Sequence, residues 1–320
     1  KGAPLMPYSV EEKRVRFHTP EWSGVIALNS TGNMICLTHR KTGMEIFRFP
    51  DSDAVLMESP AVYGIPLLLP PNRIRDGRFT AGGRTFRFPV NEEATNCFLH
   101  GLMLGREFGL KTAEEADGVL RFAVSRRFDA AHSEFSGFPC IFEAEIGYEV
   151  RAEDVRHTVC IRNLGTVPMP LGVGFHTAFC VPETERVTIE VPHLPDGAWN
   201  VHPLRRLPDG NKRAWSQLEE TILSGGESVE GAALSCMFPF PESERCVRIR
   251  RKHGTIRYEP DPLFLHAACW NDGGGKGFVC IEPMSWMTDA PNVPLPPEIS
   301  GFRLLASDSE CGFRSVISVE

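Results

Sequence analysis

The fold is decided by two neighbouring stretches, Ile141–Val150 (IFEAEIGYEV) and Val155–Ile161 (VRHTVCI). In the first, apolar side chains alternate with polar and charged ones, so one face is apolar and the other is charged. The second stretch repeats this alternation. A period of two is typical of a β-strand with one buried and one solvated face. Polar residues Arg151–Asp154 lie between the two stretches and predict a turn, so the pair is predicted to form an antiparallel hairpin.

Outward from this hairpin, short strand-like segments recur along the chain, and turn residues separate many of them. Helical patterning is weak, and the 29 glycines and 26 prolines suit turns better than long helices. The sequence therefore predicts an all-β protein, a large antiparallel β-sandwich with little helix, in which residues 1–320 form a single domain. The other predicted strands are Val25–Leu28, Met34–Thr38, Glu45–Phe49, Thr85–Phe88, Val187–Val191, Val247–Arg251, Phe264–Trp270, Gly277–Ile281 and Ser315–Val319.

Composition excludes several classes of partner. The net charge is −7 and lysine and arginine form no dominant stripe, which argues against nucleic acid or an anionic membrane surface. No apolar run approaches the roughly 18 residues that span a bilayer, and the N-terminal residues lack the apolar centre of a signal peptide. The ten cysteines form no CxxC pair, which favours reduced thiols. We therefore expect a cytoplasmic protein.

Two segments are rich in hydrogen-bond donors. Pro71–Phe79 contains Asn72 and Arg73 just ahead of a predicted hairpin, and a guanidinium offers a planar set of donors for vicinal hydroxyls or carboxylates. A charged surface loop is the alternative interpretation. Asn96–Gly101 contains His100 followed by a glycine, which lets the backbone pass close to a ligand. Here the alternative is a structural histidine, since function also needs a convergent site.

Two further segments carry groups that transfer protons. Pro170–Phe179 places His176 in an apolar, glycine-containing strand end, where an imidazole can exchange a proton near neutral pH. The alternative is a core histidine bonded to backbone. Gly277–Pro283 places Glu282 directly after an apolar strand and before a proline, which suits a general base. The alternative is an exposed carboxylate at a sheet edge.

No metal and no cofactor are predicted. The ten histidines are dispersed without short ligand spacing, and neither HExxH nor GxSxG occurs. The glycine-rich stretch Gly273–Gly277 lacks the spacing of a phosphate loop and is interpreted as a hairpin tip.

Taken together and in this order, the four segments resemble the aldose 1-epimerase (galactose mutarotase-like) family. The order and spacing agree from about Val15 to Val319. The stretches that carry the resemblance are Pro71–Phe79 followed by Thr85–Pro89, Asn96–Gly101, Pro168–Phe179 (PMPLGVGFHTAF) and Phe278–Asn292 (FVCIEPMSWMTDAPN).

The resemblance implies a super-sandwich fold with a cleft on one sheet. It implies that His176 acts as the acid and Glu282 as the base, and that Arg73 and His100 bind sugar hydroxyls. Asn72, next to Arg73, is added to the predicted binding residues. We expect the imidazole and the carboxylate to face each other across a sugar-sized hollow.

The implied activity is that of an isomerase, a mutarotase that interconverts the α and β anomers of a hexose by acid–base ring opening and closure. The partner is a small sugar, and the chain is expected to be a monomer or a homodimer. Trp270 is a candidate for stacking on a sugar face, with a core position as the alternative. Two other functions stay open, a non-catalytic carbohydrate-binding protein and a hexose-6-phosphate 1-epimerase. The second would need cations such as Arg75, Arg78 and Arg106.

Three features depart from the family pattern. The family's sugar-binding aspartate has no counterpart in Asn211–Phe238, where glutamates are the acidic residues. The tryptophan that commonly follows the family's His-Gly pair is replaced around Phe108, and Ser307–Glu310 replaces a Pro-Gly-Glu sequence near the C-terminus. These departures bear on which sugar the protein accepts.

Overall fold

The computed structural model describes residues 6–320. Strands dominate it, and the largest sheet has nine strands in the order β11-β12-β13-β14-β28-β24-β23-β18-β21. All its pairings are antiparallel. Its strands are β11 (Gly109–Ala116), β12 (Val119–Phe128), β13 (Phe142–Val150), β14 (Asp154–Asn163), β28 (Glu310–Val319), β24 (Gly254–Pro260), β23 (Val247–Arg251), β18 (Thr188–Glu190) and β21 (Ser224–Ser228).

Two smaller sheets pack against the nine-stranded one. A six-stranded sheet has the order β22-β25-β26-β16-β6, with β17 also paired to β26, and a five-stranded sheet has the order β1-β2-β3-β4-β5. The strands of the six-stranded sheet are β22 (Ser235–Pro239), β25 (His266–Trp270), β26 (Phe278–Met284), β16 (Gly174–Phe175), β17 (Thr177–Cys180) and β6 (Leu67–Leu68). Those of the five-stranded sheet are β1 (Tyr8–Glu11), β2 (Arg14–His18), β3 (Trp22–Ala27), β4 (Asn33–His39) and β5 (Met44–Glu45).

The remaining elements are short. Four two-stranded ribbons pair β7 (Arg73–Arg75) with β10 (Cys97–Leu99), β8 (Arg78–Ala81) with β9 (Arg84–Arg87), β15 (Met169–Pro170) with β27 (Leu304–Leu305), and β19 (Ala198–Val201) with β20 (Pro208–Arg213). The helices are α1 (Asp53–Glu58), α2 (Gln217–Leu223) and α3 (Pro297–Ser300), with 3-10 turns at Pro60–Val62 and Ser133–Ser136.

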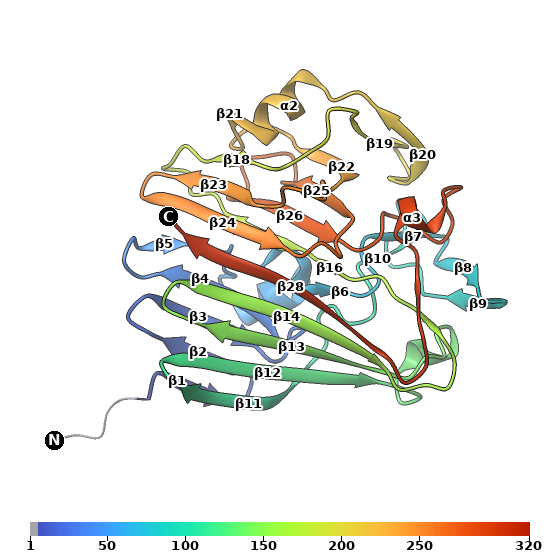
Figure 1. Cartoon of the computed structure of the whole chain (residues 1–320), viewed down its shortest axis with the longest axis horizontal. Helices are drawn as coiled ribbons and strands as arrows, with labels where there is room; N and C mark the ends of the chain where they lie inside the picture. The colour runs from blue at the N-terminus through green and yellow to red at the C-terminus, as the bar shows by residue number, and fades with distance from the viewer. Residues whose placement is uncertain (1–5) are drawn as a thin grey trace.

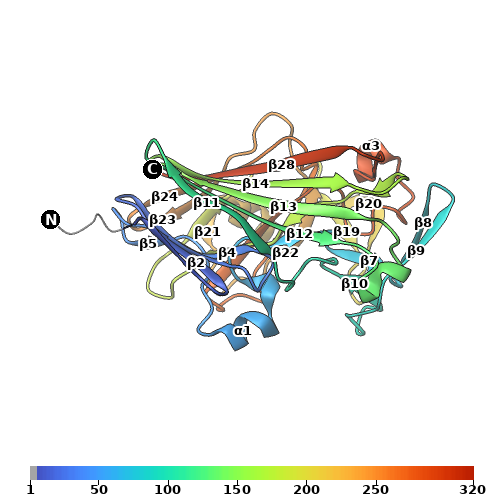
Figure 2. The same ribbon diagram turned by 90° about the horizontal axis from the view of Figure 1, so that it is seen from below.

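The core lies between the sheets and explains the predicted alternation. Along β13 every second side chain is buried, from Phe142 to Val150. Full burial of one such large apolar side chain contributes roughly 1.5–3 kcal/mol. Figure 2 shows β12, β13, β14 and β28 as one layer across the molecule, with α1 on the opposite side. Tyr148 links the layers, because its hydroxyl donates to the Gly32 carbonyl at 2.9 Å and accepts from the Met34 N–H at 3.0 Å.

The all-β prediction is confirmed, and so is the hairpin, since β13 and β14 pair with Val150 opposite Val155. The predicted strand Glu45–Phe49 is wrong: β5 ends at Glu45 and Phe47 keeps an isolated bridge to Phe179. The segment turns there to begin the connection to α1, whose N-cap Ser52 bonds the Val55 N–H.

No helix within residues 6–320 is long and apolar enough to cross a membrane. The signal-peptide prediction falls partly on residues 1–5, outside the described part of the chain.

Gly101 is required where the chain approaches β6 most closely. Its φ is +86°, and a Cβ there would lie 2.4 Å from the backbone carbonyl of Leu69. Gly83, at the tip of the β8–β9 hairpin, has φ of +71° with open space around it. Both glycines have a left-handed backbone conformation, but only at Gly101 would an added Cβ clash with neighbouring atoms.

We expect Gly101→Ala to destabilise the protein more than Gly83→Ala. The left-handed conformation costs an alanine roughly 1–2 kcal/mol at both positions. The backbone clash adds a comparable or larger cost at residue 101 alone. Urea unfolding of both variants measures the difference. Equal losses of unfolding free energy would show that the approach to Leu69 relaxes at no cost.

Candidate active site

His176 and Glu282 are brought together by the register of two antiparallel strands. Thr177 in β17 pairs with Ile281 in β26, and Gly174 in β16 pairs with Met284. Both pairs belong to one register, which places His176 directly opposite Glu282. Side chains of directly opposed residues lie on the same face of a sheet, about 4.5–5.5 Å apart at Cβ. Residues 106 positions apart in the sequence therefore become neighbours.

The two side chains touch. His176 Nε2 lies 3.3 Å from Glu282 Oε1, and each side chain is only 4% exposed. The expectation that they face each other across a sugar-sized hollow is therefore wrong in its spacing, because cross-strand neighbours on one face are already in contact. His176 Nδ1 and Glu282 Oε2 have no hydrogen-bond partner within residues 6–320. A buried polar atom without a partner costs about 1–3 kcal/mol, so both atoms are suited to accept or donate to a ligand.

Glu282 lies inside β26 and not after it, which corrects the predicted end of the strand at Ile281. The strand continues through Pro283 to Met284. Proline interrupts a ladder because it lacks an N–H. Here the neighbouring chain is itself interrupted between β16 and β17, at His176, whose N–H bonds the Pro66 carbonyl instead. The break in one strand accommodates the proline in the other.

His100 stands beside His176 at the end of a short ribbon. The ring centroids are 4.8 Å apart in an edge-to-face arrangement. The ribbon pairs Leu99 with Arg73, and the His100 N–H bonds the Asn72 carbonyl at 3.0 Å. Asn72 and His100 have φ of +55° and +65°, so both chains turn in left-handed conformation at the same end of the ribbon. This turn directs the His100 imidazole towards the pair.

His100 is neutral at neutral pH. Burial of the imidazole, followed by the charges of His176 and Arg73, holds the pKa of His100 well below its usual range. Its Nδ1 has no partner in the described chain. A neutral imidazole has one donor and one acceptor nitrogen, which suits a hydroxyl group.

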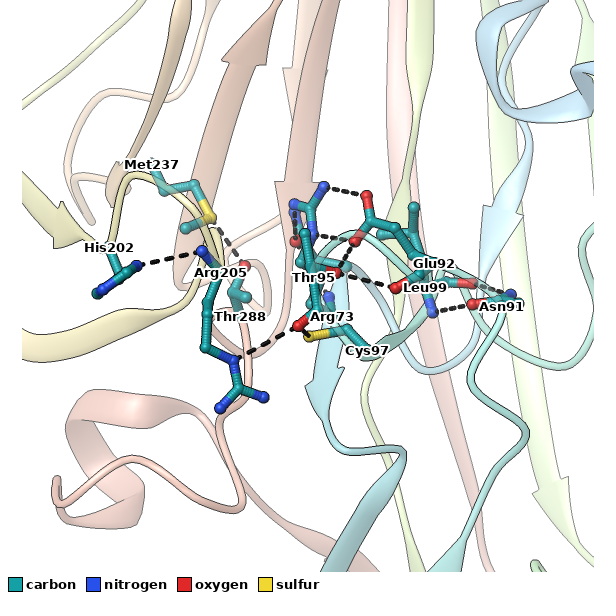
Figure 3. A network of polar contacts seen from close by, with 11 residues as sticks. Arg73, Asn91, Glu92, Thr95, Cys97, Leu99, His202, Arg205, Met237 and Thr288 are labelled. Atoms are coloured by element: carbon teal, nitrogen blue, oxygen red, sulfur yellow. Dashed lines mark hydrogen bonds and ion pairs between the residues drawn. The ribbon is translucent and has the colours of Figure 1, made fainter.

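Arg73 is held by a carboxylate that the sequence analysis did not single out. Its Nε donates to Glu92 Oε2 at 2.6 Å and its Nη2 donates to Glu92 Oε1 at 2.7 Å. The Thr95 hydroxyl also donates to Glu92 Oε2. Figure 3 shows these contacts meeting at the end of β7. Burial alone would raise the pKa of Glu92, but the hydrogen bonds from Arg73 and Thr95 lower it, so the carboxylate is ionised.

Asn72 and Trp270 take different positions. Asn72 is buried, and its Oδ1 accepts from the Arg73 N–H at 3.0 Å, so its side chain supports the ribbon. Trp270 is partly buried at the end of β25, with its ring centroid 6.0 Å from that of His176. It also packs against Phe278 at 5.6 Å. Alternation from Ala268, which is paired with Glu282, places Trp270 on the same face as the carboxylate.

Of the three arginines that a hexose-6-phosphate 1-epimerase could use, two are paired with carboxylates. Arg75 forms an ion pair with the buried Asp289 at 3.1 Å, and Arg106 pairs with Glu134. Arg78 is exposed on the β8–β9 hairpin. Asp289 also accepts from the Arg75 N–H and donates its own N–H to the Arg73 carbonyl, both at 2.9 Å. This aspartate therefore fixes β7 to the segment that follows β26.

A cavity of about 430 Å³ lies elsewhere, on the solvent face of β11–β14, and its lining contains none of the predicted site residues. Among residues 6–320, no three His, Cys, Asp or Glu side chains gather in a way that could hold a metal ion.

Similarity to solved structures defines the class of fold. A galactose mutarotase-like protein from Clostridium acetobutylicum matches with a TM-score of 0.90 and 28% identity, over 98% of this chain and 97% of that one. A galactose 1-epimerase from Lactobacillus acidophilus NCFM shares the fold with a TM-score of 0.77 at 10% identity, over 98% and 97% of the two chains. The chain belongs to the aldose 1-epimerase family, whose model matches residues 36–306.

One curated relative is an uncharacterized protein, YihR, from Escherichia coli (strain K12). It is 27% identical over 121 residues, which is 37% of this chain and 37% of that protein. The matched segment thus spans well under two thirds of that relative.

A buried core histidine, His157, is predicted to make the stability of the protein sensitive to acid. His157 lies between Tyr148 and Phe175, and neither of its ring nitrogens has a partner in residues 6–320. Burial lowers the pKa of His157 to about 3. The unfolded chain binds this proton first, near its ordinary pKa of about 6.5. Stability is therefore complete above that pH and is lost as the pH falls towards 3.

We expect His157→Phe to reduce the dependence of the free energy of unfolding on pH. Each such group changes the free energy of unfolding by at most about 1.4 kcal/mol per pH unit. Urea unfolding at pH 6.5, 5.5 and 4.5 should show a smaller loss in the variant than in the wild type. Identical slopes would mean that His157 is not a neutral buried group. The aromatic replacement keeps the contacts with Tyr148 and Phe175, which makes it the appropriate variant.

Proposed function

We propose that the protein is an aldose 1-epimerase that interconverts the α and β anomers of a hexose. The observation that supports this most strongly is the contact of His176 with Glu282 next to His100, with an unpartnered polar atom on each of the three side chains. A cluster that contains an acid, a base and a neutral imidazole matches the needs of a reaction made only of proton transfers. Family membership supports epimerase chemistry in general, and the motif resemblance implies the roles of His176 and Glu282.

In this mechanism Glu282 accepts the proton of the anomeric hydroxyl, and protonated His176 gives a proton to the ring oxygen. The bond between the anomeric carbon and the ring oxygen breaks, and the open-chain aldehyde forms. Rotation about the adjacent carbon–carbon bond exposes the other face of the carbonyl. On ring closure both protons return to their original groups. Each positioned acid or base contributes on the order of 10²–10⁴-fold.

The surrounding side chains hold the sugar. The free Oε2 of Glu282 is the acceptor for the anomeric hydroxyl. His100 and Arg73 bind other hydroxyls and fix the ring relative to the pair. Trp270, on the same face as Glu282, covers an apolar face of the sugar. Asn72 acts through Arg73, whose N–H it binds.

We expect Glu282→Gln and His176→Gln each to reduce the catalysed rate by at least about 10². The amides keep the size of the side chain and remove the proton transfer. NMR exchange or polarimetry on freshly dissolved α-glucose and α-galactose measures the rate. His18→Gln, an exposed histidine in β2, is the matched control and should retain activity.

Unchanged rates in the Glu282 or His176 variant, with folding confirmed by the unfolding midpoint, would contradict the mechanism. Sugar binding without any acceleration in the wild type would support a non-catalytic carbohydrate-binding protein instead.

A further inference from the structure

The sugar-binding aspartate of the family pattern is missing from this chain, and no glutamate of the same segment is free to replace it. Within Asn211–Phe238, Glu219 is bound to Arg213 by two hydrogen bonds and caps α2. The other three glutamates, Glu220, Glu227 and Glu230, are exposed on or beside α2 and β21. An acidic hydroxyl acceptor has to come from elsewhere in the chain.

Glu92 is supplied by a turn that folds back onto β7. The Cys97 N–H bonds the Glu92 carbonyl at 3.2 Å, and Asn96 closes the turn with φ of +54°. Asn91 fixes the turn to β10, because its side chain bonds both the N–H and the carbonyl of Leu99, at 2.7 and 3.0 Å. Figure 3 shows Asn91, Glu92 and Thr95 grouped around Arg73. The carboxylate is thus built into the same ribbon that presents His100.

The Arg73–Glu92 pair is incomplete as a hydrogen-bonding unit. A carboxylate has about four acceptor positions, and Arg73 and Thr95 occupy three of them, which leaves one on Oε1. A guanidinium has five donors, of which Glu92 takes two and the Asn72 oxygen one at 3.4 Å. The two side chains are 20% and 23% exposed, so the pair is accessible from solvent. One acceptor next to two donors suits neighbouring hydroxyls.

The Arg73–Glu92 pair also carries no net charge. Glu92 neutralises Arg73, which would otherwise present an unpaired cation to the ligand. The nearby Arg205 is held by Asp76 at 2.6 Å and reaches the Thr95 carbonyl at 3.4 Å. Arg206 is exposed on the same loop. Removing the charge of Glu92 alone would therefore leave a positive site.

We infer that Glu92 is the acidic sugar-binding residue of this protein, and that its charge makes the site select uncharged sugars over anionic ones. The inference rests on the proposed function for the location of the site. It assigns to Glu92 both a hydroxyl contact and the neutralisation of Arg73.

The test compares wild type with Glu92→Gln on galactose, galacturonate and galactose 6-phosphate. The variant should raise KM for galactose about tenfold, the effect of losing one hydrogen bond to a charged group, with kcat within about threefold. The ratio of kcat/KM for at least one anionic sugar to that for galactose should rise about tenfold or more. Glu92→Asp keeps the charge and should keep the preference for galactose.

Glu185→Gln is the matched control. Glu185 binds Arg251 through two hydrogen bonds of 2.8 and 3.1 Å, and Arg251 ends β23, across the molecule from β7 (Figure 1). This variant should lower the stability of the protein without changing KM for galactose or the ratio of kcat/KM for an anionic sugar to that for galactose. Unchanged KM and selectivity in Glu92→Gln, or the same change in Glu185→Gln, would overturn the inference.

Failure of the proposed function gives a different result. In that case the wild type accelerates the anomerisation of none of the three sugars. Ligand-observed NMR with galactose then tests Glu92 by itself: weaker binding in Glu92→Gln than in Glu185→Gln supports its role, and equal binding refutes it.

Discussion

The site depends on one register, the pairing of β17 and β16 with β26. It places an imidazole opposite a carboxylate on one face, and the direction of side chains in a pleated sheet then determines what else can surround them. On the far side of β26, Ala268 occupies the position opposite Glu282. A small side chain there leaves room beside the carboxylate, and Trp270 closes that side. The position of the proposed acid–base pair is thus set by the backbone pairing of these strands.

Around this pair the proposed sugar-binding groups are carried by turns. His100 directly follows β10, Glu92 lies in the turn that leads into β10, and Asp289 fixes β7 to the segment that follows β26. Burial raises the pKa of Asp289, against hydrogen bonds from Arg75 and Asn292. The same carboxylate therefore connects the first and the fourth of the segments that carry the family resemblance. This contact explains why Asp289 and Asn292 belong to the resemblance although neither lies against His176.

Part of this architecture could be predicted from the sequence. Alternation between apolar and polar residues located β13 and β14 because one face of each is buried along its whole length. The site was predicted by resemblance, since spacing alone does not show which strands pair. Both His157 and His176 lie in strand-forming segments, so periodicity alone does not separate the core histidine from the one beside Glu282. Glu92 could not be found in this way, because a glutamate in a polar turn has no periodic signal.

The register also limits how such a protein can change. An insertion of one residue in β17 or β26 would send one partner of the pair to the opposite face of the sheet. Loops such as Asn91–Asn96 and His202–Leu207, which contact each other through Arg205 and Thr95, have no such constraint, because they take no part in this register. Diversification of sugar preference is therefore expected to accumulate in the turns at the rim, while strand lengths beneath them stay constant.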